Sequence, residues 1–93
     1  MSASTSTPST APQEIEVLFF AQAKEAAQQP ALRLPFLEEE TVGGLRKRLV
    51  QELPRLATIL PHCLFAINEA YASENSIIPA AAKVACIPPV SGG

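Results

Sequence analysis

The sequence contains no aspartate and no tryptophan, only one histidine, and only two cysteines among its 93 residues. Without aspartate, the acidic loops that usually bind calcium or magnesium are missing. One histidine (His62) and two cysteines (Cys63 and Cys86) are too few for a four-ligand zinc site within one chain. No phosphate-binding glycine loop, dinucleotide-binding motif or serine nucleophile motif is found. These absences argue against an enzyme that works alone, and we expect no metal site.

Charge is also scarce. Charged residues make up 17% of the chain, and the formal net charge is −2. A weakly acidic protein of this kind is a poor candidate for binding nucleic acid, and no apolar run approaches the roughly 18 residues that a membrane-spanning helix needs. The N-terminus has neither the apolar segment of a secretory signal nor the arginines of a mitochondrial one. We therefore expect a cytosolic protein with neither nucleic acid nor membrane among its partners.

The apolar residues that could form a core are unevenly distributed. Residues 1–13 hold seven serines and threonines and two prolines, but almost nothing that could be buried. Such a segment cannot offset the entropy lost on ordering, so we expect a disordered N-terminal extension. About eighty residues remain, enough for one modest core. We expect a single domain over residues 14–87 and a flexible tail over residues 88–93.

Residues 14–20 predict the first strand, because β-branched and aromatic residues alternate with other side chains. Alternation places Ile15, Val17 and Phe19 on one face, and Leu18 and Phe20 on the other. Since both faces become apolar toward the end, this strand is expected to be internal or to have its second face covered.

The rest of the chain alternates between helical and extended patterns. Thr41 is the expected N-cap of the main helix, which begins at Val42 with its first turn weakened by Gly43 and Gly44. Pro35 predicts a short or edge position for the second strand. The other elements are expected as a helix over 21–29, strands over 31–36, 64–67, 70–72 and 83–87, a turn at 68–69 and an apolar contact at 77–79. This order predicts an α+β fold in which a mixed sheet of four or five strands wraps over one main helix.

Several reactive or charged residues have ordinary structural explanations. His62 follows a proline in a loop and is expected at the surface. Cys63 and Cys86 could be sulfur nucleophiles or form a disulfide, but cytosolic thiols stay reduced, and a buried cysteine more often behaves as a small apolar residue. The basic residues at 46–48 are expected on a solvated helix face, with docking of an acidic partner as the alternative. The glutamates at 38–40 are expected to be solvated as well.

The C-terminal residues point to chemistry more strongly than any side chain. The sequence ends in Pro88, Pro89, Val90, Ser91, Gly92 and Gly93. Two prolines favour a stiff, extended exit from the sheet, and two glycines let bare backbone enter a narrow channel. Chemistry on a terminal carboxylate needs such access, so the Gly93 carboxylate is the candidate reactive group.

With these residues in place, the chain resembles the small subunits of molybdopterin synthase, which are ubiquitin-like β-grasp sulfur carriers. Three pieces carry the resemblance over residues 14–93. They are residues 17–21 with Glu25, the Thr41-Val42-x-x-Leu45 start of the main helix, and the ending at 87–93. The Pro-Pro-x-Ser-Gly-Gly ending is the specific part. The resemblance implies a β-grasp fold.

The resemblance also implies a reaction at Gly93. An E1-like, ATP-dependent enzyme would adenylate its carboxylate and convert it to a thiocarboxylate (1-thioglycine), with no cofactor bound permanently. The tail would enter the large synthase subunit, in a complex expected to be a heterotetramer, and donate sulfur to cyclic pyranopterin monophosphate. By the same resemblance Ile87 lies in the partner interface, and Phe20, with Leu18 beside it, lies on the sheet face that partners cover.

Other functions stay open at this stage. Relatives that serve thiamine synthesis or tRNA thiolation share the terminal Gly-Gly. A ubiquitin-like modifier would join Gly93 to lysines of target proteins, and a β-grasp interaction module would have an inert tail. One departure from the family pattern is the Ala80-Ala81-Ala82-Lys83 segment, which stands where a Gly-Asp-Glu-like turn is common.

Overall fold

The computed structural model describes residues 13–89 and contains a five-stranded mixed sheet with the strand order β3-β2-β6-β4-β5. The elements are β2 (Glu14–Phe19), α1 (Ala21–Ala27), β3 (Ala31–Pro35), α2 (Val42–Glu52), two 3-10 helices, η2 (Pro54–Thr58) and η3 (Leu60–His62), then β4 (Leu64–Ile67), β5 (Ala70–Ala72) and β6 (Lys83–Ile87). The expected α+β architecture is confirmed. The predicted extension, apart from Gln13, and the tail residues 90–93 lie outside the described residues.

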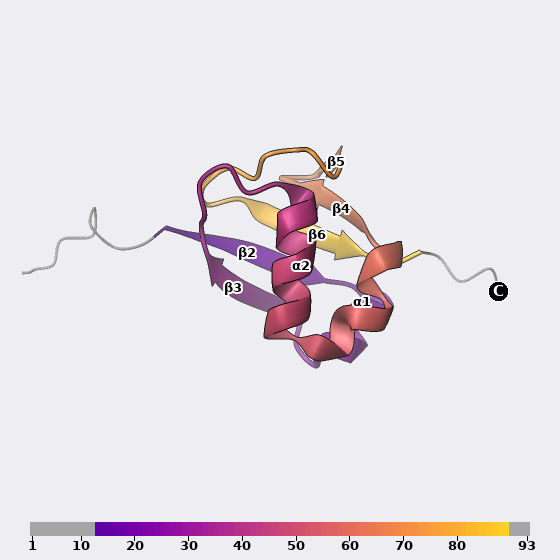
Figure 1. The fold of residues 1–93 in the computed structure, drawn as a ribbon. Helices are drawn as coiled ribbons and strands as arrows, with labels where there is room; N and C mark the ends of the chain where they lie inside the picture. Colours follow the sequence, from indigo (N-terminus) through magenta and orange to yellow (C-terminus); the bar gives the residue numbers. More distant parts are fainter. Residues whose placement is uncertain (1–12, 90–93) are drawn as a thin grey trace, which may run out of the picture.

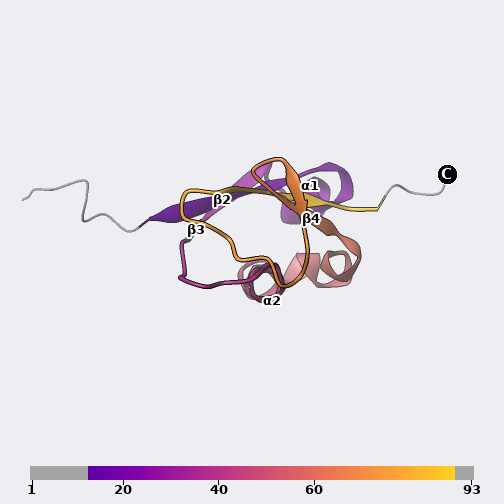
Figure 2. The same ribbon diagram turned by 90° about the horizontal axis from the view of Figure 1, so that it is seen from above.

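The sheet and α2 form two layers (Figures 1 and 2). The core between them is lined by Val42, Leu45 and Leu49 of α2 and by alternate residues of the strands, such as Val17 and Val84, all of them almost fully buried. We call the face of the sheet toward α2 the core face and the opposite one the outer face. Because α2 covers only the core face, the outer face of the sheet is not covered by this helix.

The two faces of β2 are those that alternation predicts. Ile15, Val17 and Phe19 are buried in the core, while Leu18 is half-buried and Phe20 is exposed. β2 is internal, since it pairs with β3 on one side and β6 on the other. The strand ends at Phe19, one residue earlier than expected, because Phe20 is the N-cap of α1.

The segments around β3 also follow the sequence closely. β3 lies at the sheet edge, as Pro35 predicts, and returns antiparallel to β2 with α1 in the connection. α1 ends at Ala27, two residues before the expected end, because Gln28 adopts a left-handed backbone with φ of 61°. The apolar contact at 77–79 is present as a bridge between Ile77 and Thr41, followed by the buried Ile78.

The first turn of α2 contains two glycines but is stabilised by several hydrogen bonds. Thr41 is the N-cap, and its hydroxyl accepts a hydrogen bond of 3.1 Å from the Gly44 amide. The Val42 and Gly43 amides donate to the carbonyls of Ser76 and Glu74. These bonds satisfy amides that have no partner inside the helix, so the first turn is tied to the loop before β6.

Arg46 does not lie on a solvated face, and this expectation is wrong. Its guanidinium donates to the carbonyls of Leu60 and Cys63, pairs with the Glu74 carboxylate, and stands 4.7 Å from the centre of the Phe65 ring. The side chain is only 19% exposed. Arg46 therefore joins α2, η3, the start of β4 and the β5–β6 loop.

Arg48 and Glu40 correct two further expectations of solvated charge. They form a two-pronged ion pair, with nitrogen–oxygen distances of 2.7 and 3.1 Å. Both side chains are largely buried. A planar guanidinium matches a carboxylate in this geometry, so the pair fixes the approach to α2. Lys47, by contrast, is exposed as expected.

Candidate functional site

β6 brings the C-terminal stem out of the middle of the sheet. It runs parallel to β2 and antiparallel to β4, so both neighbours flank the point where the chain leaves the domain. Ile87, its last residue, is half-buried and pairs with Leu64 of β4. Pro88 is buried and Pro89 is exposed. The stem is therefore anchored in the domain through its first proline.

The outer face around this exit is apolar. Across the strands, Leu18, Ala85, Ala66 and Tyr71 form one row, because each is the register partner of the next. Leu64 and Ile87 form the neighbouring row. Phe20 lies two residues after Leu18, directly after the end of β2. Phe20, Leu64 and Tyr71 are 47%, 58% and 74% exposed. So much exposed apolar surface in one patch is typical of a protein–protein interface.

Small residues hollow out the centre of this patch. A depression of about 410 Å³ is lined by Phe20, Ala66, Glu69, Tyr71, Ala85 and Ile87. The depression forms because the short side chains of Ala66 and Ala85 lie opposite each other at its base, and larger side chains surround them. The result is a shallow apolar socket, which we call the outer-face hollow, beside the origin of the tail.

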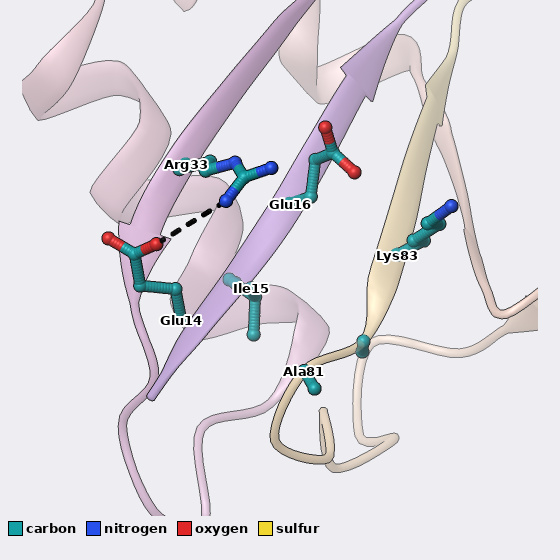
Figure 3. Close-up of a pocket in the computed structure, with 7 residues that line it drawn as sticks. Glu14, Ile15, Glu16, Arg33, Ala81 and Lys83 are labelled. Atoms are coloured by element: carbon teal, nitrogen blue, oxygen red, sulfur yellow. Dashed lines mark ion pairs between the residues drawn. The ribbon is translucent and has the colours of Figure 1, made fainter. Parts of the chain in front are cut away.

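The other end of the outer face is charged. Glu14 and Glu16 of β2, Arg33 of β3 and Lys83 of β6 line a second, smaller depression (Figure 3). The Arg33 guanidinium lies 3.9 Å from the Glu14 carboxylate, and both side chains are exposed. Exposed pairs of this kind contribute little to stability. The outer face is thus divided into a charged end and an apolar end, and the tail leaves from the apolar end.

The two cysteines do not have the properties of nucleophiles. Cys63 and Cys86 are free thiols buried in the core, and the Cys63 thiol donates a hydrogen bond to the Ile59 carbonyl. Burial raises the pKa of both thiols, and for Cys86 the neighbouring Cys63 raises the pKa further. Since the thiolate is the reactive form, both residues act as small apolar core residues. This confirms the structural explanation.

No other catalytic or metal-binding constellation emerges from residues 13–89. His62 is exposed in η3, as expected. Over this range no group of three or more histidine, cysteine or acidic side chains could hold a metal ion. None of the helices described is long and apolar enough to cross a membrane.

The predicted interface residues come together, and others join them. Phe20 and Ile87 both line the outer-face hollow, and Leu18 is the register partner of Ala85 on its floor. Val90, Ser91, Gly92 and Gly93 lie outside the described residues. Ala66, Glu69, Tyr71 and Ala85 were not predicted as site residues. Ala85 could have been identified from the strand pattern, because alternate residues of a strand share a face and Ala85 is two residues before Ile87.

Comparison with known proteins agrees with this arrangement. The model of the ThiS family matches residues 17–93. The molybdopterin synthase sulfur carrier subunit of Arabidopsis thaliana is 35% identical over 80 residues, covering 86% of this chain and 83% of that protein. The corresponding subunit of Drosophila yakuba is 34% identical over 82 residues, covering 85% and 90%.

Solved structures show the same fold. The crystal structure of SAMP1 from Haloferax volcanii superposes with a TM-score of 0.76 at 27% identity, over 86% of this chain and 99% of that one. A complex of subunits 1 and 2 of the molybdopterin-converting factor from Helicobacter pylori contains a chain with a TM-score of 0.62 at 22% identity, over 86% and 99%. Taken with the match over residues 17–93, these relatives show that the chain belongs to the ThiS family, as a ubiquitin-like β-grasp protein similar to the sulfur carrier subunits of molybdopterin synthase.

Proposed function

We propose that this chain is the sulfur carrier subunit of a molybdopterin synthase and that Gly93 carries the sulfur. The observation that carries the proposal is the position of the stem. β6 leads from the centre of the sheet, beside an exposed apolar hollow, into Pro88, Pro89 and a Gly-Gly ending. The curated relatives at 34–35% identity support the same function.

The proposed chemistry takes place on the backbone carboxylate of Gly93. A carboxylate is a poor electrophile, so an E1-like activating enzyme first joins it to AMP, with release of pyrophosphate from ATP. A sulfide-level sulfur nucleophile then attacks the acyl carbon of the glycyl adenylate, and AMP leaves. The resulting 1-thioglycine sulfur is a good nucleophile near neutral pH and forms a bond to a carbon of cyclic pyranopterin monophosphate, displacing an oxygen substituent. Water then hydrolyses the acyl–sulfur bond, which leaves the sulfur on the pterin and returns Gly93 as a carboxylate. Both forms of Gly93 are covalent intermediates, and no cofactor stays bound.

The chain itself contributes position rather than acid–base catalysis. Pro88 and Pro89 favour a stiff, extended exit from the sheet, and the glycines at 92 and 93 carry no Cβ, so bare backbone can enter a partner's channel. Val90 and Ser91 are the spacer between the two. The cysteines are buried thiols with raised pKa values, so neither is assigned a part in the sulfur relay. The acid–base groups therefore belong to the partner enzymes.

Two partners follow from this scheme. The large synthase subunit would cover the apolar end of the outer face, including Leu18, Phe20 and Ile87, and receive the tail in a heterotetramer. The activating enzyme would bind the same end, since it needs the same carboxylate. The Helicobacter pylori structure, a complex of subunits 1 and 2 of the molybdopterin-converting factor, supports a large-subunit partner. All these steps belong in the cytosol.

The test uses the full chain with an activating enzyme, ATP and a sulfur source. Intact-mass measurement should show one oxygen of the chain replaced by one sulfur. The loaded chain, mixed with the large subunit and cyclic pyranopterin monophosphate, should then produce molybdopterin. Lysine side chains joined to Gly93 would indicate a modifier instead. A chain that gains no sulfur, while a known carrier gains it in the same mixture, contradicts the proposal.

A further inference from the structure

The turn between β4 and β5 holds Glu69 in an unusual backbone conformation. Asn68 and Glu69 have φ values of 50° and 74°, both in the left-handed region. A two-residue hairpin turn of this kind favours asparagine followed by glycine, because most side chains are strained there. Asn68 fits the preference, and Glu69 does not. Since glycine would satisfy the turn without strain, the presence of a strained glutamate makes Glu69 a candidate for function.

Asn68 fixes the position of this turn against β6. The backbone amide of Asn68 donates to the Lys83 carbonyl at 2.8 Å, and its side-chain Oδ1 accepts from the Lys83 backbone amide at 3.0 Å. These bonds continue the pairing of β4 with β6 to the end of the strand. Glu69, the next residue, is thereby held at the rim of the outer-face hollow.

Glu69 brings a charge to a hollow that is otherwise lined, among the described residues, by Phe20, Ala66, Tyr71, Ala85 and Ile87. Its side chain is exposed, and the ion pairs found within residues 13–89 do not include it. A partner that covers the apolar hollow removes water from this carboxylate. Such desolvation is unfavourable unless the partner supplies a positive charge or hydrogen-bond donors.

We propose that Glu69 selects the partner that binds the outer-face hollow. The partner segment inserts a large apolar side chain over Ala66 and Ala85 and places an arginine or lysine against the Glu69 carboxylate. This inference rests on the proposed function, because the segment belongs to the large synthase subunit that receives the tail. The hollow is continuous with the stem through Ile87, so one partner contacts both. Charge complementarity at the rim then sets the orientation in which the tail is presented.

The experiment measures binding of the full chain to the large synthase subunit of the same organism by calorimetry. Glu69→Gln removes the charge with little change in shape, and Glu69→Gly also relieves the backbone. Glu52→Gln is the matched control, since Glu52 is exposed on α2, in the layer on the other side of the sheet. At about 0.05 M salt both Glu69 variants should bind roughly three- to tenfold more weakly than the native chain, and the difference should fall below about twofold at 0.5 M.

A second readout separates binding from stability. Glu69→Gln should leave the melting temperature unchanged, and Glu69→Gly should raise it while still weakening binding. Native-like affinity and salt dependence in Glu69→Gln would overturn the assignment. A native homodimer that the large subunit does not displace would overturn it too, because a second copy would then fill the hollow. Neither result would affect the proposed carrier function, which is tested separately by the uptake and transfer of sulfur.

Discussion

Ala85 of β6 lies directly opposite Ala66 of β4, so that two small side chains lie side by side at the centre of the outer face. Larger residues in this row, Leu18 and Tyr71, stand on either side. The same strand that supplies Ala85 continues through Ile87 into the proline stem. The outer-face hollow and the start of the proline stem are therefore carried by the same strand.

Filling the outer-face hollow should prevent the large synthase subunit from docking without unfolding the protein. Ala85→Leu places a branched side chain in the hollow, where open space on the outer face accommodates it. We expect the affinity for the large synthase subunit to fall at least about tenfold, because steric exclusion from a central hot spot typically costs more than 1.4 kcal/mol. Calorimetric titration measures the loss.

The control for this variant lies on the same strand and the same face. Lys83→Leu adds a leucine at the charged end of β6, outside the outer-face hollow. It should bind with an affinity close to that of the native chain, and both variants should keep their melting temperatures. Equal binding by Ala85→Leu and the native chain would show that the hollow is not the docking surface.

Arg46 should be one of the most important polar residues for stability. Arg46→Ala removes the side-chain donor to the carbonyls of Leu60 and Cys63 and the cation over the Phe65 ring. The Leu60 carbonyl keeps the Cys63 amide as a donor, so the loss is greatest at the Cys63 carbonyl. We expect the free energy of unfolding to fall by about 2–3 kcal/mol. Urea denaturation measures the change.

Glu74 provides the comparison for Arg46. Its side chain is 57% exposed. Glu74→Gln should therefore cost no more than about 1 kcal/mol, as is usual for an exposed ion pair. If Arg46→Ala cost as little as Glu74→Gln, the contacts to the carbonyls and the ring would be unimportant.

Gly44 offers a stabilising substitution. A Cβ at Gly44 would stand 3.5 Å from Glu40 Cγ, an ordinary contact, whereas one at Gly43 would stand 3.3 Å from Glu74 Oε1. Gly44→Ala should raise the free energy of unfolding by about 0.4–1 kcal/mol through reduced entropy of the unfolded chain. Gly43→Ala should gain less, because it crowds the carboxylate that pairs with Arg46. Thermal unfolding of both variants checks this order, and a destabilised Gly44→Ala would contradict it.

The buried thiols should make stability fall at alkaline pH. Burial and the neighbouring Cys63 raise the pKa of Cys86 above its usual value of 9.0. Above that value the unfolded chain releases a proton that the folded protein keeps, so the free energy of unfolding falls as pH rises; below it the contribution is fully present. Urea denaturation between about pH 8 and pH 10 should therefore show a smaller loss for Cys86→Ala than for the native chain. An identical loss would assign the effect to other groups.

The sequence was sufficient where the information is local. Alternation along β2 separated Val17 from Leu18, Thr41 was identifiable as an N-cap, and Pro35 indicated an edge strand. Each of these predictions depends on a residue's own type and its nearest neighbours in the chain. On the outer face, alternation placed Phe20 with Leu18, whereas Ile87 was predicted from the family resemblance.

The remainder depends on contacts between distant segments. Arg46 looked like a solvated charge because its partners Leu60, Cys63 and Glu74 are 14 to 28 positions away. The role of Ala66 and Ala85 emerges only from the register between β4 and β6, since an alanine alone does not indicate a hollow. The register of the strands therefore determines the site as much as the identity of its residues.

The most direct test follows the mass of the chain through one round of loading and transfer. The native chain is incubated with activating enzyme, ATP and a sulfur source, purified, and mixed with the large subunit and cyclic pyranopterin monophosphate. A chain lacking Gly93 is treated in parallel. The native chain should gain one sulfur in place of one oxygen and lose it as molybdopterin forms, whereas the shortened chain should gain nothing and keep the native melting temperature. Sulfur uptake by the shortened chain, or none by the native chain beside a loaded control carrier, would rule out Gly93 as the sulfur-carrying residue.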